Sequence, residues 1–265
     1  MMRVWIFYPI FVLFLMGGGI AICYGIAVTT GSVQRPPIWP TVSETGVCTP
    51  ARGWFTMFLT WGSFFILASV YCYYKRIDKE LVAGYSPNTR GYCSLESVKR
   101  CNCAALIFGV FGSIGVTVVS SFQTNCDKLT TTNHFAGALI AFISLTVYAW
   151  LVAFVSFSLQ RLSCCDKFWA TTRAVLAVLA TASFITFVVG FGLDKKNNIN
   201  PNSNLTTIAE WIMIYLAILY VFTLVGDLKK IEKVKMEFDL IRGVSHQEGD
   251  PLLIYGVNLP SLNQA

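Results

Sequence analysis

The stretch Phe135–Leu159, which reads FAGALIAFISLTVYAWLVAFVSFSL, decides the fold. It carries no charged side chain, and as a helix it is long enough to cross the roughly 30 Å hydrocarbon core of a bilayer. Five other stretches have a similar length and composition. The predicted membrane-spanning helices are Val4–Val28, Trp54–Tyr74, Ala104–Phe122, Phe135–Leu159, Ala174–Leu193 and Ile208–Val225. The sequence therefore predicts an all-α, polytopic membrane protein with six transmembrane helices.

The composition agrees with a membrane protein. Hydrophobic residues make up 55% of the chain and charged residues 13%, whereas a soluble domain carries about 25% charged residues. The only charge within a predicted span is Glu210, near the start of the last one. Ionisable groups deep in a membrane mark proton relays and ion-coupling sites, so their scarcity argues against a secondary transporter or a charged pore.

The distribution of basic residues predicts the topology. Fifteen of the twenty Lys and Arg residues lie in alternate segments, namely the N-terminus, the second and fourth loops and the C-terminal tail. The positive-inside rule places both termini in the cytosol. The glycosylation sequon at Asn204 falls in the fifth loop, on the opposite side, where it is usable. We expect a transmembrane domain over residues 1–240 and a disordered cytosolic tail over residues 241–265.

Two of the nine cysteines lie in predicted outer loops. These are Cys48 in the first loop and Cys126 in the third, and the outer compartment is oxidising. A disulfide between them is our hypothesis, and the alternative is a pair of free thiols.

Polar side chains gather at the predicted outer boundary of the membrane, and they are Glu44, Gln123, His134 and Glu210. An acidic group in the first turn of a helix suits the helix dipole, which gives Glu210 a structural interpretation. Alternatively, the histidine and the carboxylates bind a lipid headgroup, sense luminal pH or act as acid and base on a lipid. The chain carries no Walker loop, H-E-x-x-H or G-x-S-x-G motif, so we expect no catalytic residue, cofactor or metal.

The C-terminal tail carries the form of an acidic dileucine sorting motif. Its residues are Glu248, Leu252 and Leu253, in a polar segment with predicted cytosolic exposure. The motif favours a lysosome or late endosome, with Golgi, endoplasmic reticulum or plasma membrane as alternatives. The expected partners are membrane lipids and, through the tail, clathrin adaptors. Nothing in the chain indicates nucleic acid, and the sequence does not specify other protein partners.

Three segments together resemble a known family. They are Val42-Ser43-Glu44-Thr45-Gly46 with Pro50; Ser121-Phe122-Gln123 followed by His134-Phe135-Ala136-Gly137-Ala138-Leu139; and Ala209-Glu210-Trp211 leading to Gly226-Asp227-Leu228-Lys229-Lys230. They are similar to the hallmarks of the six-helix damage-regulated autophagy modulator (DRAM) family over about residues 1–240. Members of that family often carry Asp at the position of Glu44 and Cys at that of Ala209. The residues after Ile241 have no counterpart in the resemblance.

The resemblance implies a function. It indicates a non-enzymatic, multi-pass lysosomal or endosomal membrane protein that modulates autophagy. The wider superfamily includes proteins of GPI-anchor remodelling and of phosphatidylinositol 4-kinase recruitment, so the alternative is a lipid-handling protein of the secretory pathway or plasma membrane. A third hypothesis is a lipid-acting enzyme that uses Glu44, His134 and Glu210 as acid–base groups.

Overall fold

The computed structural model describes residues 4–33, 39–82, 94–124, 127–159, 164–197, 203–229 and 231, and these residues form helices and their connections. Six helices or helical rods are long and apolar enough to cross a membrane, which confirms the predicted all-α, six-span class. The elements are η1 (Val4–Ile6), α1 (Phe7–Val12), η2 (Leu13–Gly18), α2 (Gly19–Thr29), η3 (Glu44–Gly46), α3 (Ala51–Val82), α4 (Leu95–Ser121), α5 (Lys128–Ser158), α6 (Cys164–Lys196), α7 (Asn204–Phe222) and α8 (Val225–Leu228).

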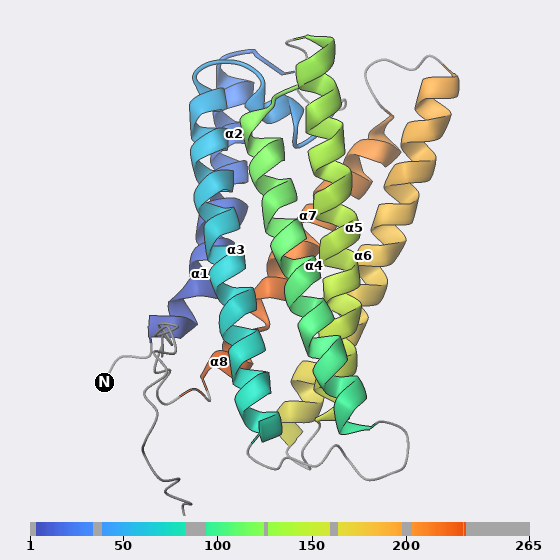
Figure 1. Cartoon of the computed structure of the whole chain (residues 1–265). Coiled ribbons are helices and arrows are strands. Elements are labelled where there is room, and N and C mark those ends of the chain that lie inside the picture. The colour runs from blue at the N-terminus through green and yellow to red at the C-terminus, as the bar shows by residue number, and fades with distance from the viewer. Residues whose placement is uncertain are drawn as a thin grey trace, which may run out of the picture. The chain divides into compact units, whose positions relative to one another are not determined.

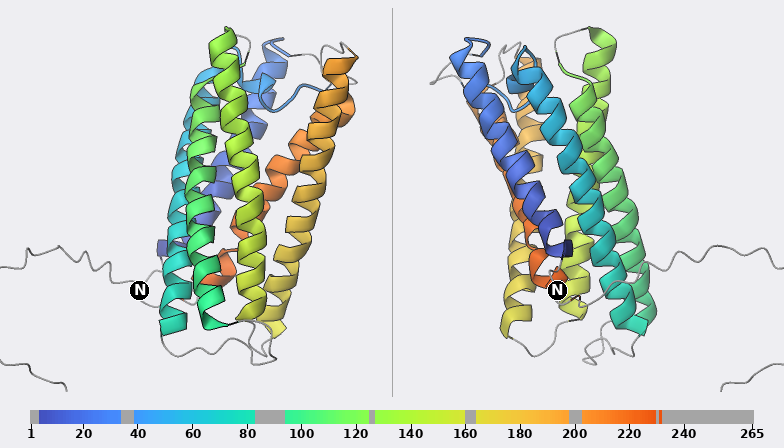
Figure 2. Two further views of the ribbon diagram at one scale, coloured as in Figure 1. Left: turned by 45° about the vertical axis from the view of Figure 1, so that its right-hand side comes forward. Right: turned by 90° about the vertical axis from the view of Figure 1, so that its left-hand side faces the viewer.

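The spans run alternately up and down (Figure 1). The first span is a single rod of η1, α1, η2 and α2, in which η2 is a π-helical segment. We call the end that carries η3 and the starts of α5 and α7 the upper end, and the opposite end, which carries α8, the lower end. Helices α5 and α6 lie close together at the lower end and diverge toward the upper end (Figure 2). Residues of both upper halves line the cavity described below.

Helix lengths differ from the sequence prediction, because hydropathy detects only the part of a helix that meets hydrocarbon. Helix α3 continues to Val82, eight residues past Tyr74, and α6 begins at Cys164, ten residues before Ala174. The predicted span Ala174–Leu193 leaves Arg173 in the fourth loop, and this placement was wrong. Arg173 lies within α6, and only 1% of its surface is exposed.

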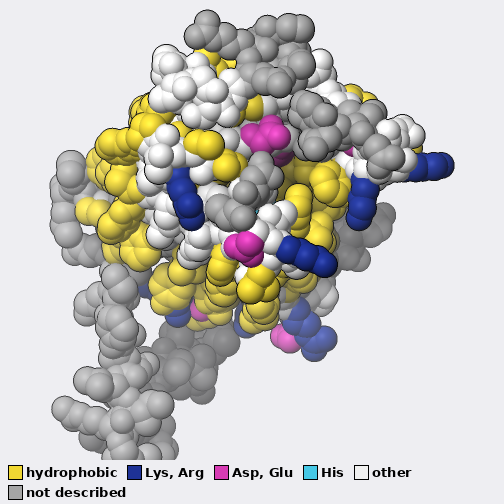
Figure 3. Space-filling view, turned by 90° about the horizontal axis from the view of Figure 1, so that it is seen from above, with side chains coloured by type: hydrophobic (Ala, Val, Ile, Leu, Met, Phe, Trp, Pro, Cys, Tyr) yellow, Lys and Arg dark blue, Asp and Glu magenta, His cyan; other side chains and the backbone are white. Residues whose placement is uncertain are grey.

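Close helix packing uses glycine where two backbones meet. A Cβ atom added to Gly115 on α4 would lie 2.4 Å from the backbone nitrogen of Ala141 on α5. The two backbones can approach this closely only because Gly115 has no side chain. The resulting van der Waals contact favours helix association, since the hydrophobic effect does not drive helices together in lipid. Outside these contacts the bundle presents large apolar side chains, which Figure 3 shows around its sides when the bundle is viewed from above.

The chain divides into a compact unit, Met1–Glu232, and a second segment, Lys233–Ala265. The second segment lies outside the described residues. The predicted disordered tail, and with it the motif at Glu248, Leu252 and Leu253, therefore stays a prediction.

Candidate functional site

A cavity of about 480 Å³ lies in the upper half of the bundle, between α5 and α7 and below the connection that carries η3. Its walls are mostly apolar and come from every span. They include Ile20, Leu59, Val119, Phe142, Leu145 and Ile218. The volume and the lining fall in the usual range for small-molecule sites, which combine a hydrophobic wall with a few placed polar groups.

Aromatic side chains form the wall between α5 and α6, where the two helices diverge. The ring centroids of Phe135 and Phe191 are 5.5 Å apart, and those of Phe142 and Phe187 are 6.4 Å apart. Both pairs join one helix to the other. These aromatic side chains therefore make the contact between α5 and α6 where the two backbones diverge.

The connection above the cavity is held by its own hydrogen bonds. The backbone nitrogen of Thr41 donates to Oε2 of Glu44 at 2.7 Å, and the backbone nitrogen of Glu44 donates to Oγ1 of Thr41 at 3.2 Å. This reciprocal pair has the form of a capping box and closes the turn that leads into η3. The indole nitrogen of Trp211 on α7 donates to the carbonyl of Pro40 at 2.9 Å, which ties the connection to α7. The Glu44 carboxylate therefore turns back onto its own segment.

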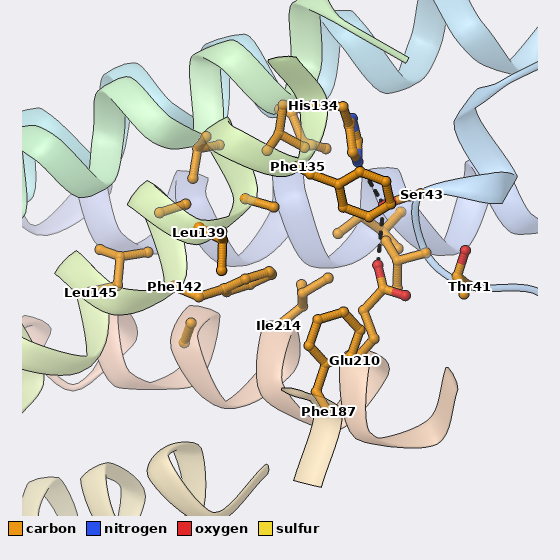
Figure 4. A pocket seen from close by; sticks show the side chains of 18 of the residues that line it. Thr41, Ser43, His134, Phe135, Leu139, Phe142, Leu145, Phe187, Glu210 and Ile214 are labelled. Atoms are coloured by element: carbon orange, nitrogen blue, oxygen red, sulfur yellow. Dashed lines mark hydrogen bonds between the residues drawn. The ribbon is translucent and has the colours of Figure 1, made fainter. Parts of the chain in front are cut away.

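Three side chains from three elements meet at the polar end of the cavity. His134 of α5 and Glu210 of α7 point toward Ser43 between them (Figure 4). Nε2 of His134 lies 3.0 Å from Oγ of Ser43, and Oγ of Ser43 lies 3.1 Å from Oε1 of Glu210. Nδ1 of His134 lies 2.5 Å from the carbonyl oxygen of Phe122. His134 and Glu210 are both buried.

The hydrogen bonds fix the number of protons in this network. A carbonyl only accepts, so Nδ1 of His134 carries a proton and donates it to Phe122. The Ser43 hydroxyl has one proton for two contacts, and the other contact needs a proton on Nε2 of His134 or on the Glu210 carboxyl group. The network therefore holds one proton more than a neutral imidazole and a carboxylate would. Its net charge is zero in either arrangement, which suits a buried site.

Among the described residues that line the cavity, one buried side-chain oxygen has no hydrogen-bond partner. Oγ1 of Thr124 is buried and lacks a hydrogen bond, although Thr124 lines the cavity. The residue is 9% exposed. Buried hydroxyl groups are normally hydrogen-bonded, so this one is available to a further partner.

The four polar residues predicted to cluster are only partly together. His134 and Glu210 meet through Ser43, and Glu44 lines the same cavity. Gln123 does not line it, because its amide nitrogen donates to Thr56 and to the carbonyl of Ser120. The dipole interpretation of Glu210 was wrong, since α7 begins at Asn204 and has no acidic residue in its first turn.

Sequence reasoning passed over Ser43 and Thr124 as site residues. Ser43 was visible only as the neighbour of Glu44 in the segment that carries the family resemblance. Its place between two helices far apart in the sequence is a tertiary feature. Thr124 stands directly after Gln123 and carried no signal of its own.

A second polar cluster lies at the lower end. Asp227 of α8 binds Arg173 of α6 through Oδ2 and Arg76 of α3 through Oδ1, the latter at 2.6 Å. Arg76 also pairs with Glu80 at 2.7 Å. Arg173 further donates to Ser156 at 2.7 Å, and to the hydroxyl and carbonyl oxygens of Thr223 at 3.1 and 3.0 Å. The cluster ties α3, α5, α6 and α8 together.

The remaining predicted sites are untested. Cys48 is exposed, but Cys126 lies outside the described residues, so their disulfide stays a prediction. Asn204 is exposed at the start of α7, and its Oδ1 accepts a hydrogen bond from the backbone nitrogen of Trp39 at 3.4 Å. Among the described residues, no three His, Cys, Asp or Glu side chains group as metal ligands.

The fold and the site define a class: a six-span membrane protein whose bundle encloses an amphipathic cavity beneath its first connection. The family model of the Frag1/DRAM/Sfk1/Cwh43P N-terminal domain matches residues 4–231. The chain belongs to this family, and the predicted resemblance is confirmed.

Named relatives agree with the family. The chain is 26% identical to human DNA damage-regulated autophagy modulator protein 1, over 85% of this chain and 91% of that one. It is 25% identical to the rat DNA damage-regulated autophagy modulator protein 2, over 78% of each chain. It is 26% identical to Modulator of macroautophagy TMEM150B-B of Xenopus laevis, over 80% of each. No solved structure matches. These relatives support the predicted class, a multi-pass membrane modulator of autophagy.

Proposed function

We propose that this chain modulates autophagy from the membrane of lysosomes or late endosomes, and that it does so without catalysing a reaction. The family and the names of the relatives support the process. The tail motif supports the location, because an acidic residue followed by two leucines is the form that clathrin adaptors read on the cytosolic side.

The order of the polar residues supports a non-enzymatic role. In a serine hydrolase the histidine stands between the serine and the acid, accepts the serine proton on one nitrogen and is oriented by a carboxylate on the other. Here Ser43 stands between His134 and Glu210, and the second nitrogen of His134 binds a backbone carbonyl. This arrangement does not prepare Ser43 as a nucleophile. It joins the first connection to α5 and α7.

The test follows the tagged, full-length protein in cells. Leu252→Ala combined with Leu253→Ala removes the sorting motif, and Leu259→Ala combined with Leu262→Ala is the matched control in the same tail. We expect the wild type and the control to reside in lysosomes or late endosomes and the motif variant to leave them. Autophagic flux should change when the chain is over-expressed or removed. Unchanged flux would refute the proposed process, and unchanged residence of the motif variant would refute the sorting role.

The cavity favours a second candidate function, a lipid-handling protein of the secretory pathway or plasma membrane. An apolar volume with a polar end is the shape of a site for one amphiphile. Residence in the Golgi or the plasma membrane, together with unchanged autophagic flux, would support this function over the first.

A further inference from the structure

We propose that the cavity binds a single-tailed lipid whose head carries an ammonium group and a hydroxyl group, a long-chain amino alcohol. The proposal rests on the cavity itself and does not depend on the role in autophagy. Four features of the cavity support it: its volume, the charge of its lining, its unpaired hydroxyl and its exposed side.

The volume fits one tail. A cavity of roughly 150 Å³ accepts a benzene molecule of six carbons, and this cavity of about 480 Å³ is about three times as large. It therefore has room for about eighteen carbon-sized atoms. That is one long alkyl chain, whereas a membrane phospholipid carries two.

The charge of the lining selects the head. Glu44, His134 and Glu210 are the only carboxylic-acid or imidazole side chains among the described lining residues, and none of the described lining residues is Lys or Arg. A phosphate or carboxylate head would meet two acidic side chains, and no Lys or Arg among the described lining residues would neutralise it. Moving the alkyl tail from the bilayer into the apolar cavity contributes little binding free energy, because both environments are hydrocarbon-like. Discrimination among lipids therefore depends on the head.

An ammonium head can replace the proton of the His134–Ser43–Glu210 network. In the empty site that proton keeps the network neutral. When a protonated amine binds beside Glu210, the network gives up its proton to solvent, which leaves neutral His134 and a Glu210 carboxylate paired with the ammonium. Charge and protons balance, because one cation enters as one proton leaves. Hydrogen bonds between charged groups are stronger than neutral ones, so the exchange favours an amine.

The head's hydroxyl group has a place to bind as well. Thr124 lines the cavity, and its buried Oγ1 has no hydrogen-bond partner among the described residues. A hydroxyl group of the ligand would satisfy it. The ligand would enter from the membrane, because Phe135, Leu139 and Val188 line the cavity and are also exposed on α5 and α6. These side chains are apolar, as an opening toward hydrocarbon requires.

The experiment measures binding to the purified full-length chain in lipid nanodiscs. The probe is a photo-crosslinkable amino alcohol with about eighteen non-hydrogen atoms in its head and tail together. Its competitors are the unlabelled amino alcohol, the alkyl phosphate and the fatty acid of the same length. We expect the amino alcohol to compete at least tenfold better than either anionic lipid. Calorimetry in buffers of different ionisation enthalpy should show about one proton released per ligand bound.

Three variants separate the parts of the proposal. Glu210→Gln removes the carboxylate and should weaken amine binding about tenfold or more. Thr124→Val removes an unpaired hydroxyl, so it should leave folding intact and weaken binding about fivefold. Ala217→Phe fills the cavity from α7 and should abolish binding of every tail. Glu96→Gln makes the same chemical change as the first variant at an exposed residue of the lower end and should bind as the wild type does.

Each outcome bears on the proposal. Competition by the alkyl phosphate or the fatty acid equal to that by the amino alcohol would overturn the assignment of the head. Undiminished crosslinking in Ala217→Phe would overturn the cavity as the site. If Glu210→Gln fails to fold, Thr124→Val and Ala217→Phe decide alone, and wild-type affinity in both would refute the proposal.

Discussion

Removing the carboxylate of Asp227 should destabilise the bundle far more than removing an exposed carboxylate. Its oxygens pair with Arg173 and Arg76, and the side chains of Asp227 and Arg173 are 11% and 2% exposed. Asp227→Asn would leave the Arg173 guanidinium buried without its counter-charge. Breaking a buried ion pair in this way costs about 3–5 kcal/mol. That is a large part of a total stability of about 5–15 kcal/mol.

The control is the pair between Arg100 and Glu96, one turn apart on α4, whose side chains are 79% and 64% exposed. Glu96→Gln should cost about 0.3–0.5 kcal/mol. The assay is the free energy of unfolding in detergent micelles titrated with a denaturing detergent, for both variants and the wild type. The combination Arg173→Met with Asp227→Leu should recover part of the loss, because it leaves no bare charge and Arg76 keeps Glu80. A cost for Asp227→Asn within about 1 kcal/mol of that for Glu96→Gln would refute this reasoning.

Three further predictions concern local features. Gly115→Ala should destabilise the bundle by about 1–3 kcal/mol, because its Cβ would lie 2.4 Å from a backbone nitrogen of α5. Gly25→Ala is the control, because a Cβ there meets nothing within 4 Å and should leave the stability unchanged. The free energies of unfolding of the two variants are compared. Asp127 caps α5 and accepts hydrogen bonds from the side chain and the backbone nitrogen of Thr130, which lower the pKa of its carboxyl group. The carboxylate should therefore stabilise α5 at pH values above the ordinary aspartate range, and this stabilisation should be lost as the pH falls through the lowered pKa. The difference in stability between the wild type and Asp127→Asn should then disappear. Cys48 and Cys126 should resist alkylation until a reductant is added, and labelling of both thiols without it would exclude their disulfide.

The membrane-spanning helices could be predicted from the sequence because a bilayer imposes length and apolarity on each segment by itself. Their ends could not. The lower parts of α3 and α6 contain polar and charged residues beyond the apolar stretches. Hydropathy therefore assigns these parts to loops, although they are helical. Arg173 was misplaced for this reason. Its burial depends on Asp227, Ser156 and Thr223, which come from other parts of the chain.

The site could be predicted only in part. His134 and Glu210 stood out because ionisable residues at a membrane boundary are rare, and the topology placed both at the same end. Ser43 joins them in the structure, and no periodicity or motif predicts that contact. Gln123 appeared equivalent in the sequence but faces α3, since its amide group meets Thr56. Packing decides whether a polar residue at the end of a helix faces the cavity or a neighbouring helix.

The two polar clusters differ in a way that separates a structural role from a binding role. Charged groups are paired in both: Arg76 and Arg173 face Glu80 and Asp227 at the lower end, and the network of His134, Ser43 and Glu210 retains one proton at the upper end. The lower cluster surrounds about 30 Å³ of free space and engages its buried guanidinium with four partner atoms, so it has room for a water molecule but not for a lipid. The upper cluster adjoins about 480 Å³ and an unpaired hydroxyl. The lower cluster therefore holds helices together, whereas the upper cluster lies beside a volume that could hold a ligand. The upper end is therefore where the activity of this chain should be sought.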